Sequence, residues 1–315
     1  MTPTIARLRL VAAAALFSTG GAAIKATTLN AWQVASFRSG VAALALVLLV
    51  PAARRRWSLR VVAVGTLFAG TMILFVLANK LTTSANAIFL QSTAPLWVLL
   101  AGPLLHERAT RDDVLLMLVI AAGMALVFVG ADRAQATAPD PLRGNLLAIV
   151  SGVFYAGTVL GLRWLGRGHA ESSSSDGVAT VVAGNVVACL VALPMALGAP
   201  SLHVPALHAP DVAVVLYLGV VQIGLAYLAL STAMPHVPAI EASTLLLVEP
   251  ALNPVWAYLV HHERPSPLAW AGGALIVLGA AAKTLWDARR ERPAPGADAR
   301  AADARAPATV PPSSG

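Results

Sequence analysis

The chain has 315 residues, of which 57% are hydrophobic and 12% charged, and its formal net charge is +7. Soluble domains carry roughly 25% charged residues, and the mean hydropathy of this chain is +0.73. These values exclude an ordinary soluble protein and predict an integral membrane protein. The arginines cluster between apolar segments and in the C-terminal tail, so nucleic acid is not an expected partner. One cysteine, Cys189, permits no intrachain disulfide and leaves the compartment open.

Ten apolar segments have the length of a membrane-spanning helix, about 17–25 residues. Charges, prolines and N-cap residues mark their ends. From about Arg289 the chain becomes rich in Ala, Pro and Arg, and we expect the tail, residues 288–315, to be disordered. The segments are Leu8–Thr27, Ala31–Val50, Val61–Asn79, Ser84–Leu105, Val114–Gly130, Asn145–Leu165, Gly177–Leu197, Val212–Thr232, Ala239–Val260 and Leu268–Trp286.

The first segment follows Arg7 and Arg9, as in a secretory signal, but it leads directly into a second apolar segment. We therefore interpret it as a membrane helix. With the N-terminus inside, 16 Lys and Arg residues fall on the inner side and 5 on the outer side, among them Lys25 and Lys80. This bias predicts a multi-pass protein of the cytoplasmic membrane with both termini cytoplasmic.

The two halves of the chain resemble each other. Ala78, Asn86, Ala87 and Pro95 match Ala233, Glu241, Ala242 and Pro250 at an offset of 155, and His106-Glu107-Arg108 and Gly123 match His262-Glu263-Arg264 and Gly279 at an offset of 156. Five helices are an odd number, so the second copy must enter the membrane in the opposite orientation. The fold class predicted is all-α, with ten transmembrane helices as two inverted five-helix repeats, residues 8–130 and 144–286.

These motifs resemble the drug/metabolite transporter superfamily, specifically its EamA-type ten-helix carriers. The resemblance covers about residues 8–286 and depends on Pro95 and Pro250 preceding the two His-Glu-Arg motifs, and on Arg38 in the second helix. It implies export or uptake of amino acids, sugars, nucleotide-linked compounds or drugs, often by exchange or proton coupling. The second half has Gly184 or Asn185 where Arg38 would recur, so a basic site would be one-sided.

Glu249 is the most informative residue because a carboxylate near mid-membrane costs about 2.5–3.5 kcal/mol. Pro250 and Pro254 follow it and remove backbone donors one turn earlier. A carboxylate beside freed carbonyls suits a cation, a proton or a substrate amine. Asn253 shares its helix face. The alternative is a protonated carboxyl that holds two helices together.

Arg38 lies seven residues into the second helix and needs a partner, because a guanidinium stays charged in a protein. The partner is a substrate carboxylate, or Glu249 in a permanent pair, unless the side chain reaches the membrane surface. With both groups free, Arg38 and Glu249 would match the two charges of an amino acid.

Further polar residues are spaced along single helix faces. Ser151, Tyr155 and Thr158 form a stripe on the sixth segment, and Ser18, Gly21 and Lys25 form one on the first. These stripes line a cavity or form hydrogen bonds between helices. Gln91, Asn185 and Gln222 are weaker candidates. The predicted substrate-binding residues are Glu249, Arg38, Tyr155, Asn253, Ser151, Thr158, Gln91 and Ser18.

Glu107 and Glu263 lie at helix ends, where we expect them to cap helices or fasten loops rather than to touch substrate. The pattern His261-His262-Glu263-Arg264 is not a zinc-binding HExxH motif, so no metal site is predicted. No phosphate-binding glycine loop is found, and no cofactor is predicted.

The sequence therefore predicts a secondary transporter that does not use ATP, an exporter of amino acids or similar small polar metabolites by alternating access, and not an enzyme. Its partners are a small-molecule substrate and the lipid bilayer, with proton coupling and oligomeric state left open. The alternatives are a lipid-carrier flippase of the same fold and an intramembrane enzyme acting on lipid-linked substrates.

Overall fold

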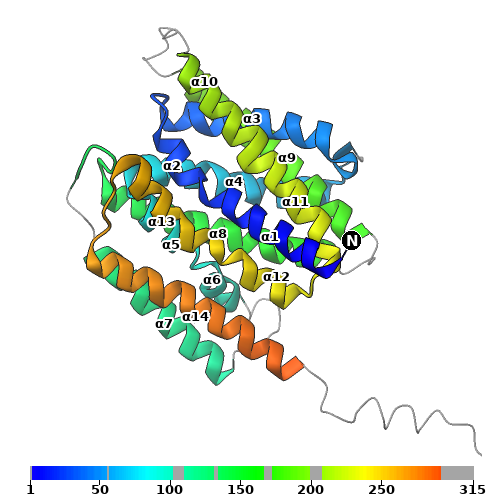
Figure 1. The fold of residues 1–315 in the computed structure, drawn as a ribbon, viewed down its shortest axis with the longest axis vertical. Coiled ribbons are helices and arrows are strands. Elements are labelled where there is room, and N and C mark those ends of the chain that lie inside the picture. Colours follow the sequence, from blue (N-terminus) through cyan, green and yellow to red (C-terminus); the bar gives the residue numbers. More distant parts are fainter. Residues whose placement is uncertain are drawn as a thin grey trace, which may run out of the picture.

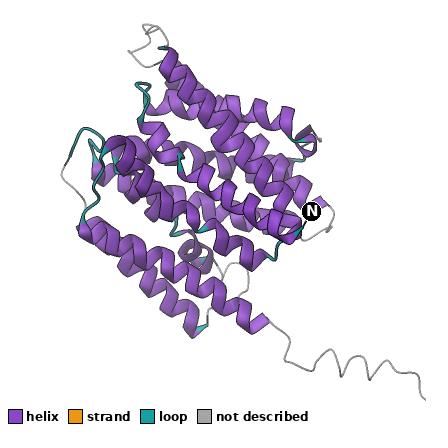
Figure 2. Ribbon diagram, viewed as in Figure 1, coloured by secondary structure: helices purple, strands orange, loops and turns teal. Residues whose placement is uncertain are grey.

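The computed structural model of the chain describes residues 2–54, 57–101, 110–130, 134–166, 172–198 and 208–291. Within these ranges the chain forms helices joined by loops and no strand, apart from one isolated bridge between Gln135 and Ala138 (Figure 2). The prediction of an all-α protein is confirmed. The predicted motif around Glu107 and most of the predicted tail lie outside the described residues.

In the first half, five polar side chains accept a hydrogen bond from the backbone N–H three residues further on and so cap helix N-termini: Thr2, Asn30, Ser58, Thr83 and Thr110. Such caps satisfy donors that have no partner within the helix. The elements are α1 (Pro3–Ser18), α2 (Gly20–Lys25), α3 (Ala31–Leu49), η1 (Pro51–Arg54), α4 (Leu59–Leu81), α5 (Ser84–Gln91), α6 (Ala94–Leu100) and α7 (Arg111–Val129).

The second half contains a π-helical stretch, η3 (Tyr217–Leu225), between two α-helices. Its last helix extends into the first residues of the segment that the sequence assigns to the tail. The elements are α8 (Pro141–Gly166), α9 (Ser172–Leu197), α10 (Ala209–Leu216), η3, α11 (Ala226–Ala233), η4 (Met234–His236), α12 (Ala239–Leu246), α13 (Val248–His261) and α14 (Pro267–Glu291).

Seven helical stretches in the described part of the chain are long and apolar enough to cross a membrane. A further helix, α14, has a shorter apolar part, Pro267–Ala282. The fourth and ninth predicted segments are instead each broken into two helices, α5 with α6 and α12 with α13. The seven stretches are Pro3–Lys25, Ala31–Leu49, Leu59–Leu81, Arg111–Val129, Pro141–Gly166, Asp176–Leu197 and Ala209–His236.

Contacts between the two halves occur in matching pairs. The packing of α4 on α8 has a counterpart in α11 on α1, and that of α4 on α9 in η3 on α3. The contacts of α5 and α6 with α8 correspond to those of α12 and α13 with α1. Two further pairs join equivalent helices directly, α3 with α9 and α7 with α14, and α5 contacts α13 where the two broken segments meet. The pair α7 and α14 lies side by side at one edge of the molecule (Figure 1).

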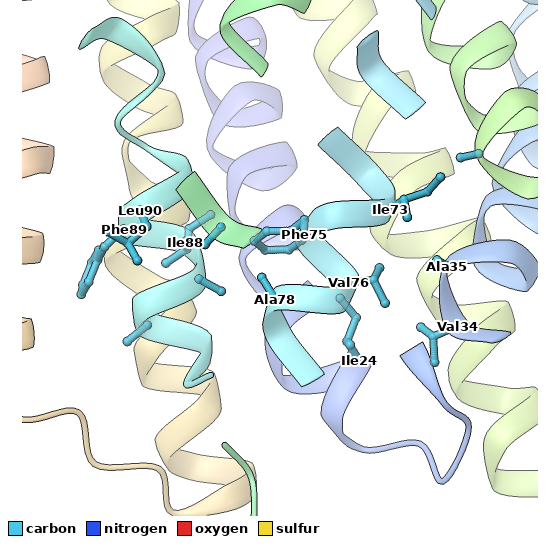
Figure 3. Packing of buried hydrophobic residues seen from close by; sticks show 14 of the residues in the cluster. Ile24, Val34, Ala35, Ile73, Phe75, Val76, Ala78, Ile88, Phe89 and Leu90 are labelled. Carbon is cyan, nitrogen blue, oxygen red and sulfur yellow. The ribbon is translucent and has the colours of Figure 1, made fainter. Parts of the chain in front are cut away.

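We call one end of the bundle the Lys25 end. There α2, α4 and α13 finish while α5 and α8 begin. Three contacts show that these helix ends lie together: Lys25 pairs with Glu263, Ser84 N–H donates to Glu263, and Asp140 N–H donates to the carbonyl of Leu81. Toward this end, apolar side chains of α2, α3, α4 and α5 pack into one cluster, with Ile24, Val34, Val76 and Ile88 among them (Figure 3).

The opposite end, which we call the Arg7 end, holds the start of α1. Arg7 pairs there with Glu241 at the start of α12, and Arg9 donates to Thr232 near the end of α11. Arg60 at the start of α4 lies over the ring of Trp164 near the end of α8. Each end is therefore fastened by contacts between the two halves.

Candidate functional site

A cavity of about 360 Å³ lies between the two halves. Drug-sized ligands occupy pockets of about 300–1,000 Å³, so this one suits a small metabolite. Its apolar walls include Phe17, Phe68, Phe75 and Ile88. Its polar lining comes from both halves: Arg38, Thr71, Gln91, Ser92, Tyr155, Gln222, Tyr227 and Glu249.

Both broken helices meet this cavity at their breaks. Ser92 lies in the gap between α5 and α6, and Leu247 lies in the gap between α12 and α13; both line the cavity. Prolines follow each gap, Pro95 in α6 and Pro250 in α13, and proline cannot donate a backbone hydrogen bond to the preceding turn. Paired helix breaks in the two halves of a membrane protein are a pointer to a binding site.

Arg38 of α3 is 2% exposed and lines the cavity. One terminal nitrogen lies 3.4 Å from the sulfur of Met72, and its Nε has no hydrogen-bond partner. The ion pairs found between described residues include Arg7–Glu241, Lys25–Glu263 and Arg143–Asp140, and none found there involves Arg38. The guanidinium is thus a buried charge that is available to an anion.

Glu249 is the second residue of α13 and lines the same cavity. It likewise takes no part in the ion pairs found in the described part of the chain. The alternative of a permanent Arg38–Glu249 pair is therefore not what the structure contains. A guanidinium and a carboxyl group therefore line one cavity without forming an ion pair with each other.

Gln91 and Tyr155, two further predicted site residues, also line the cavity. The ring of Tyr155 is 44% exposed, and we attribute this exposure to its place in the cavity wall. The Nε2 of Gln91 donates to Ser151 Oγ at 2.8 Å, and Ser151 donates to the carbonyl of Thr71 at 3.1 Å. Ser151 therefore lies behind Gln91 and holds its amide, with the hydroxyl itself outside the lining.

The other three predicted residues lie outside the lining. Thr158 is buried and donates to the carbonyl of Phe154 one turn earlier on α8. Ser18 accepts from Trp256 Nε1 at 2.9 Å, a contact between α1 and α13. Asn253 is completely buried one turn beyond Glu249, toward the Lys25 end.

Charged groups close the Lys25 end of the bundle. Lys25 and Glu263 form a 2.6 Å ion pair with side chains 4% and 1% exposed. Lys25 also donates to the carbonyls of Thr82 and Thr137, and Glu263 accepts from the N–H of Ser84 at the start of α5. The expectation that Glu263 caps a helix and fastens a loop is confirmed.

Two residues of the cavity lining were not among the predicted substrate-binding residues: Tyr227 was not predicted, and Gln222 was only a weaker candidate. These residues are five positions apart and lie on either side of the boundary between η3 and α11. A search at the 3.6-residue period of an α-helix does not place them on one face, whereas a π-helical stretch shifts the faces. Only the helix type could have revealed the pair.

The family model described as "EamA-like transporter family" matches residues 4–129 and again residues 142–284. The chain belongs to the EamA-like transporter family.

The two matches of this EamA-like protein show that it consists of two repeats. A solved structure described only as "Crystal structure of protein" is 21% identical, with a TM-score of 0.57, and the match covers 92% of this chain and 100% of that one. This likeness shows the fold alone. No curated protein matches the chain. The family and the apolar helices together make it a multi-pass membrane protein of transporter type.

Proposed function

We propose that this EamA-like protein is a secondary transporter that exports amino acids or similar small polar metabolites by alternating access. The observation that carries the proposal is the pair Arg38 and Glu249, a guanidinium and a carboxyl group that line one cavity without pairing with each other. A buried charge without a partner is costly. A ligand with both a carboxylate and an amine removes this cost at both groups at once.

The shape of the lining favours amino acids with a sizeable side chain. Arg38 would receive the carboxylate, and Glu249 the ammonium group. Aromatic and aliphatic side chains such as Phe17, Phe68 and Phe75 form much of the remaining wall, and a hydrophobic substituent would pack on them. Gln91 is held by Ser151 in a fixed orientation, which suits a group that orients the ligand.

The proposed architecture is ten membrane spans in two inverted repeats. Support comes from the helix ends. In the first repeat, α2 and α7 finish at the Lys25 end, and the hydrogen bond from Ser266 to the carbonyl of Gly130 places the end of α7 there. In the second repeat, α8, which corresponds to α1 and α2 together, and α14, which corresponds to α7, begin at that end. Equivalent helices therefore run in opposite directions. Pairwise contacts between the halves also match under exchange of the repeats.

We place the protein in the cytoplasmic membrane. In the proposed orientation the Lys25 end faces outward and both termini lie in the cytoplasm. At the Lys25 end the ion pair is buried, whereas at the Arg7 end the pair Arg7–Glu241 has side chains 51% and 34% exposed. The closed outer end and the looser inner end fit a carrier that faces inward. Opening outward would require the Lys25–Glu263 pair to separate.

Counterflow in proteoliposomes tests this function. The purified protein is reconstituted with unlabelled amino acids inside, and uptake of each labelled amino acid is measured. We expect uptake of at least one amino acid, and its loss in Glu249→Gln. The control is Asp140→Asn, since Asp140 forms an exposed pair with Arg143, three residues further along the chain, away from the cavity lining.

Two outcomes would overturn the proposal. Translocation of a lipid-linked substrate with no counterflow of any amino acid would identify a flippase. Formation of a product in detergent, where no gradient exists, would identify an enzyme.

A separate result concerns Glu249 alone. Uptake that keeps its rate and its pH dependence in Glu249→Gln would show that Glu249 takes part in neither substrate binding nor proton coupling.

A further inference from the structure

Gln91 is the last residue of α5, at the break before α6, and its side chain lies against α8. The approach of α8 is close here, because a methyl group on Gly152 would lie 3.1 Å from the carbonyl oxygen of Gln91 and 3.2 Å from that of Leu90. The residue before this glycine, Ser151, is completely buried and contacts the Gln91 amide. The packing of α8 therefore fixes one end of that amide.

The hydrogen atoms of this contact decide which end of the amide is fixed. Ser151 Oγ lies 3.1 Å from the backbone carbonyl oxygen of Thr71, which can only accept, so the one hydroxyl hydrogen of Ser151 goes to Thr71. Ser151 Oγ then accepts from Nε2 of Gln91 at 2.8 Å. The reverse orientation of the amide would need the same hydroxyl hydrogen, and one of the two hydrogen bonds would be lost. One hydrogen bond favours the observed orientation about 2- to 12-fold.

The side-chain oxygen of Gln91, Oε1, is consequently the end of the amide that remains for the cavity. It accepts no hydrogen bond within the described part of the chain, and Gln91 belongs to the cavity lining. An amide oxygen is an acceptor without a hydrogen of its own. A ligand group that faces this oxygen must therefore bring an N–H or O–H donor.

Glu249 provides a second acceptor, and α8 connects the two. Tyr155 lies one turn beyond Ser151 on α8, about 6 Å along the helix axis, and it interacts electrostatically with Glu249. Ser151 and Tyr155 share one face of α8, with Gln91 bound at the first position and Glu249 near the second. Both acceptors line the same cavity. They are therefore placed to act on one end of a small ligand.

We propose that Gln91 and Glu249 together bind the ammonium group of the substrate and select primary amines over quaternary ones. This inference rests on the proposed function, in which Glu249 receives the ammonium group. A carboxylate attracts a cationic nitrogen whether or not that nitrogen carries hydrogens. A neutral amide oxygen gains chiefly through a hydrogen bond, which needs an N–H. A primary ammonium has N–H donors for both groups, whereas a trimethylammonium group has none.

The test is calorimetric binding to the purified full-length protein, with L-leucine, L-methionine and the N,N,N-trimethyl derivative of each as probes. The substitution is Gln91→Leu, since leucine is close to glutamine in size and Leu246 stands at the equivalent position of the second repeat, also in the lining. We expect Gln91→Leu to weaken binding of the unmodified amino acids about 10- to 150-fold, the range of a hydrogen bond to a charged group. Binding of the trimethyl derivatives should stay nearly the same, so the ratio of the two affinities falls by that factor.

Ser151→Ala and Thr180→Val form a matched pair that tests the positioning of Gln91. Both hydroxyls are completely buried, but Thr180 donates to the carbonyl of Asp176 within α9 and lies outside the lining. We expect Ser151→Ala to lower the preference for the primary amine about 2- to 12-fold, because the amide of Gln91 can then turn. Thr180→Val should leave the preference unchanged.

Three results would overturn this selection. Equal binding of the amino acids and their trimethyl derivatives by the unchanged protein would do so, as would an unchanged affinity ratio in Gln91→Leu. Binding of neither amino acid would be the third. In each case, counterflow of an amino acid would show that the proposed transport function still holds.

Discussion

Arg38 illustrates how single residues define this cavity. Arg38 is 2% exposed, its one polar contact within the described part of the chain is with the sulfur of Met72, and its Nε is unpartnered. A charge kept in this state contributes little to the stability of the fold, because its desolvation is not offset by a partner. The proposed function gives this charge a role in a bound state that contains an anion.

Replacement of Arg38 by methionine separates these two roles. We expect Arg38→Met to leave the unfolding midpoint unchanged or higher, because a buried unpaired charge is exchanged for an apolar side chain. Binding of the transported amino acid should weaken about 10- to 150-fold, the equivalent of a charged hydrogen bond. Calorimetry measures the binding, with Arg143→Met, an exposed arginine outside the cavity lining, as the control. A large fall in stability together with unchanged affinity would show that Arg38 is structural.

At the scale of elements, the breaks in the fourth and ninth predicted segments bring backbone and polar groups to the cavity. The intact helices around them pack through small residues instead. On α7 and α14, a methyl group on Gly272 would lie 2.4 Å from the carbonyl oxygen of Gly123, and one on Gly123 would lie 2.7 Å from that of Gly272. Backbone therefore approaches backbone at this crossing, as is common between membrane helices.

The α7–α14 crossing can be tested with two glycines. Gly272→Ala should destabilise the protein by about 1–3 kcal/mol, since the backbone it meets cannot move aside as a side chain would. Gly177→Ala is the control, because a methyl group there meets nothing within 4 Å, and it should be neutral or stabilising by up to about 1 kcal/mol. Unfolding by titration with a denaturing detergent measures both. Equal effects would mean that the close approach contributes nothing.

The ends of α2 and α13 are joined by the buried pair Lys25–Glu263. Removing one partner, as in Lys25→Met, should cost about 3–5 kcal/mol because a buried carboxylate is left without its counter-charge. The double variant Lys25→Met/Glu263→Gln should lose less than the sum of the single variants. A double-mutant cycle measured by reversible unfolding supplies the coupling energy. Strict additivity would show that the two groups do not interact energetically.

At the scale of the whole molecule, the proposed alternating access requires that the same cavity be reached from either side in turn. Ser92 lines the cavity, and Cys189 is the only cysteine of the chain. In a Cys189→Ser background, Ser92→Cys should react with an impermeant thiol reagent from the cytoplasmic side and react slowly from outside. Adding Lys25→Met should raise the outside rate, because it removes the pair that closes that end. Equal labelling from both sides before that change would contradict the inward-facing assignment.

Much of the fold could be predicted from the sequence, because membrane burial is recorded in local composition. Long apolar runs, the charges that flank them and the shared Pro and His-Glu-Arg motifs predicted an all-helical chain of two repeats without any tertiary information. The same reasoning selected Arg38, Gln91, Tyr155 and Glu249, which line one cavity. Charged and amide side chains within apolar segments can be recognised in a sequence because placing them in the membrane costs free energy.

Other features depended on packing between segments that are distant in the chain. Helix breaks at Ser92 and Leu247, the π-helical stretch before Tyr227, and the position of Ser151 behind Gln91 are decided by neighbours more than by local pattern. Hydropathy gives the cost of placing a polar side chain in lipid, but it does not give the direction in which that side chain points. Which polar groups face the cavity and which bind each other were decided by the tertiary structure, because those partners belong to different helices.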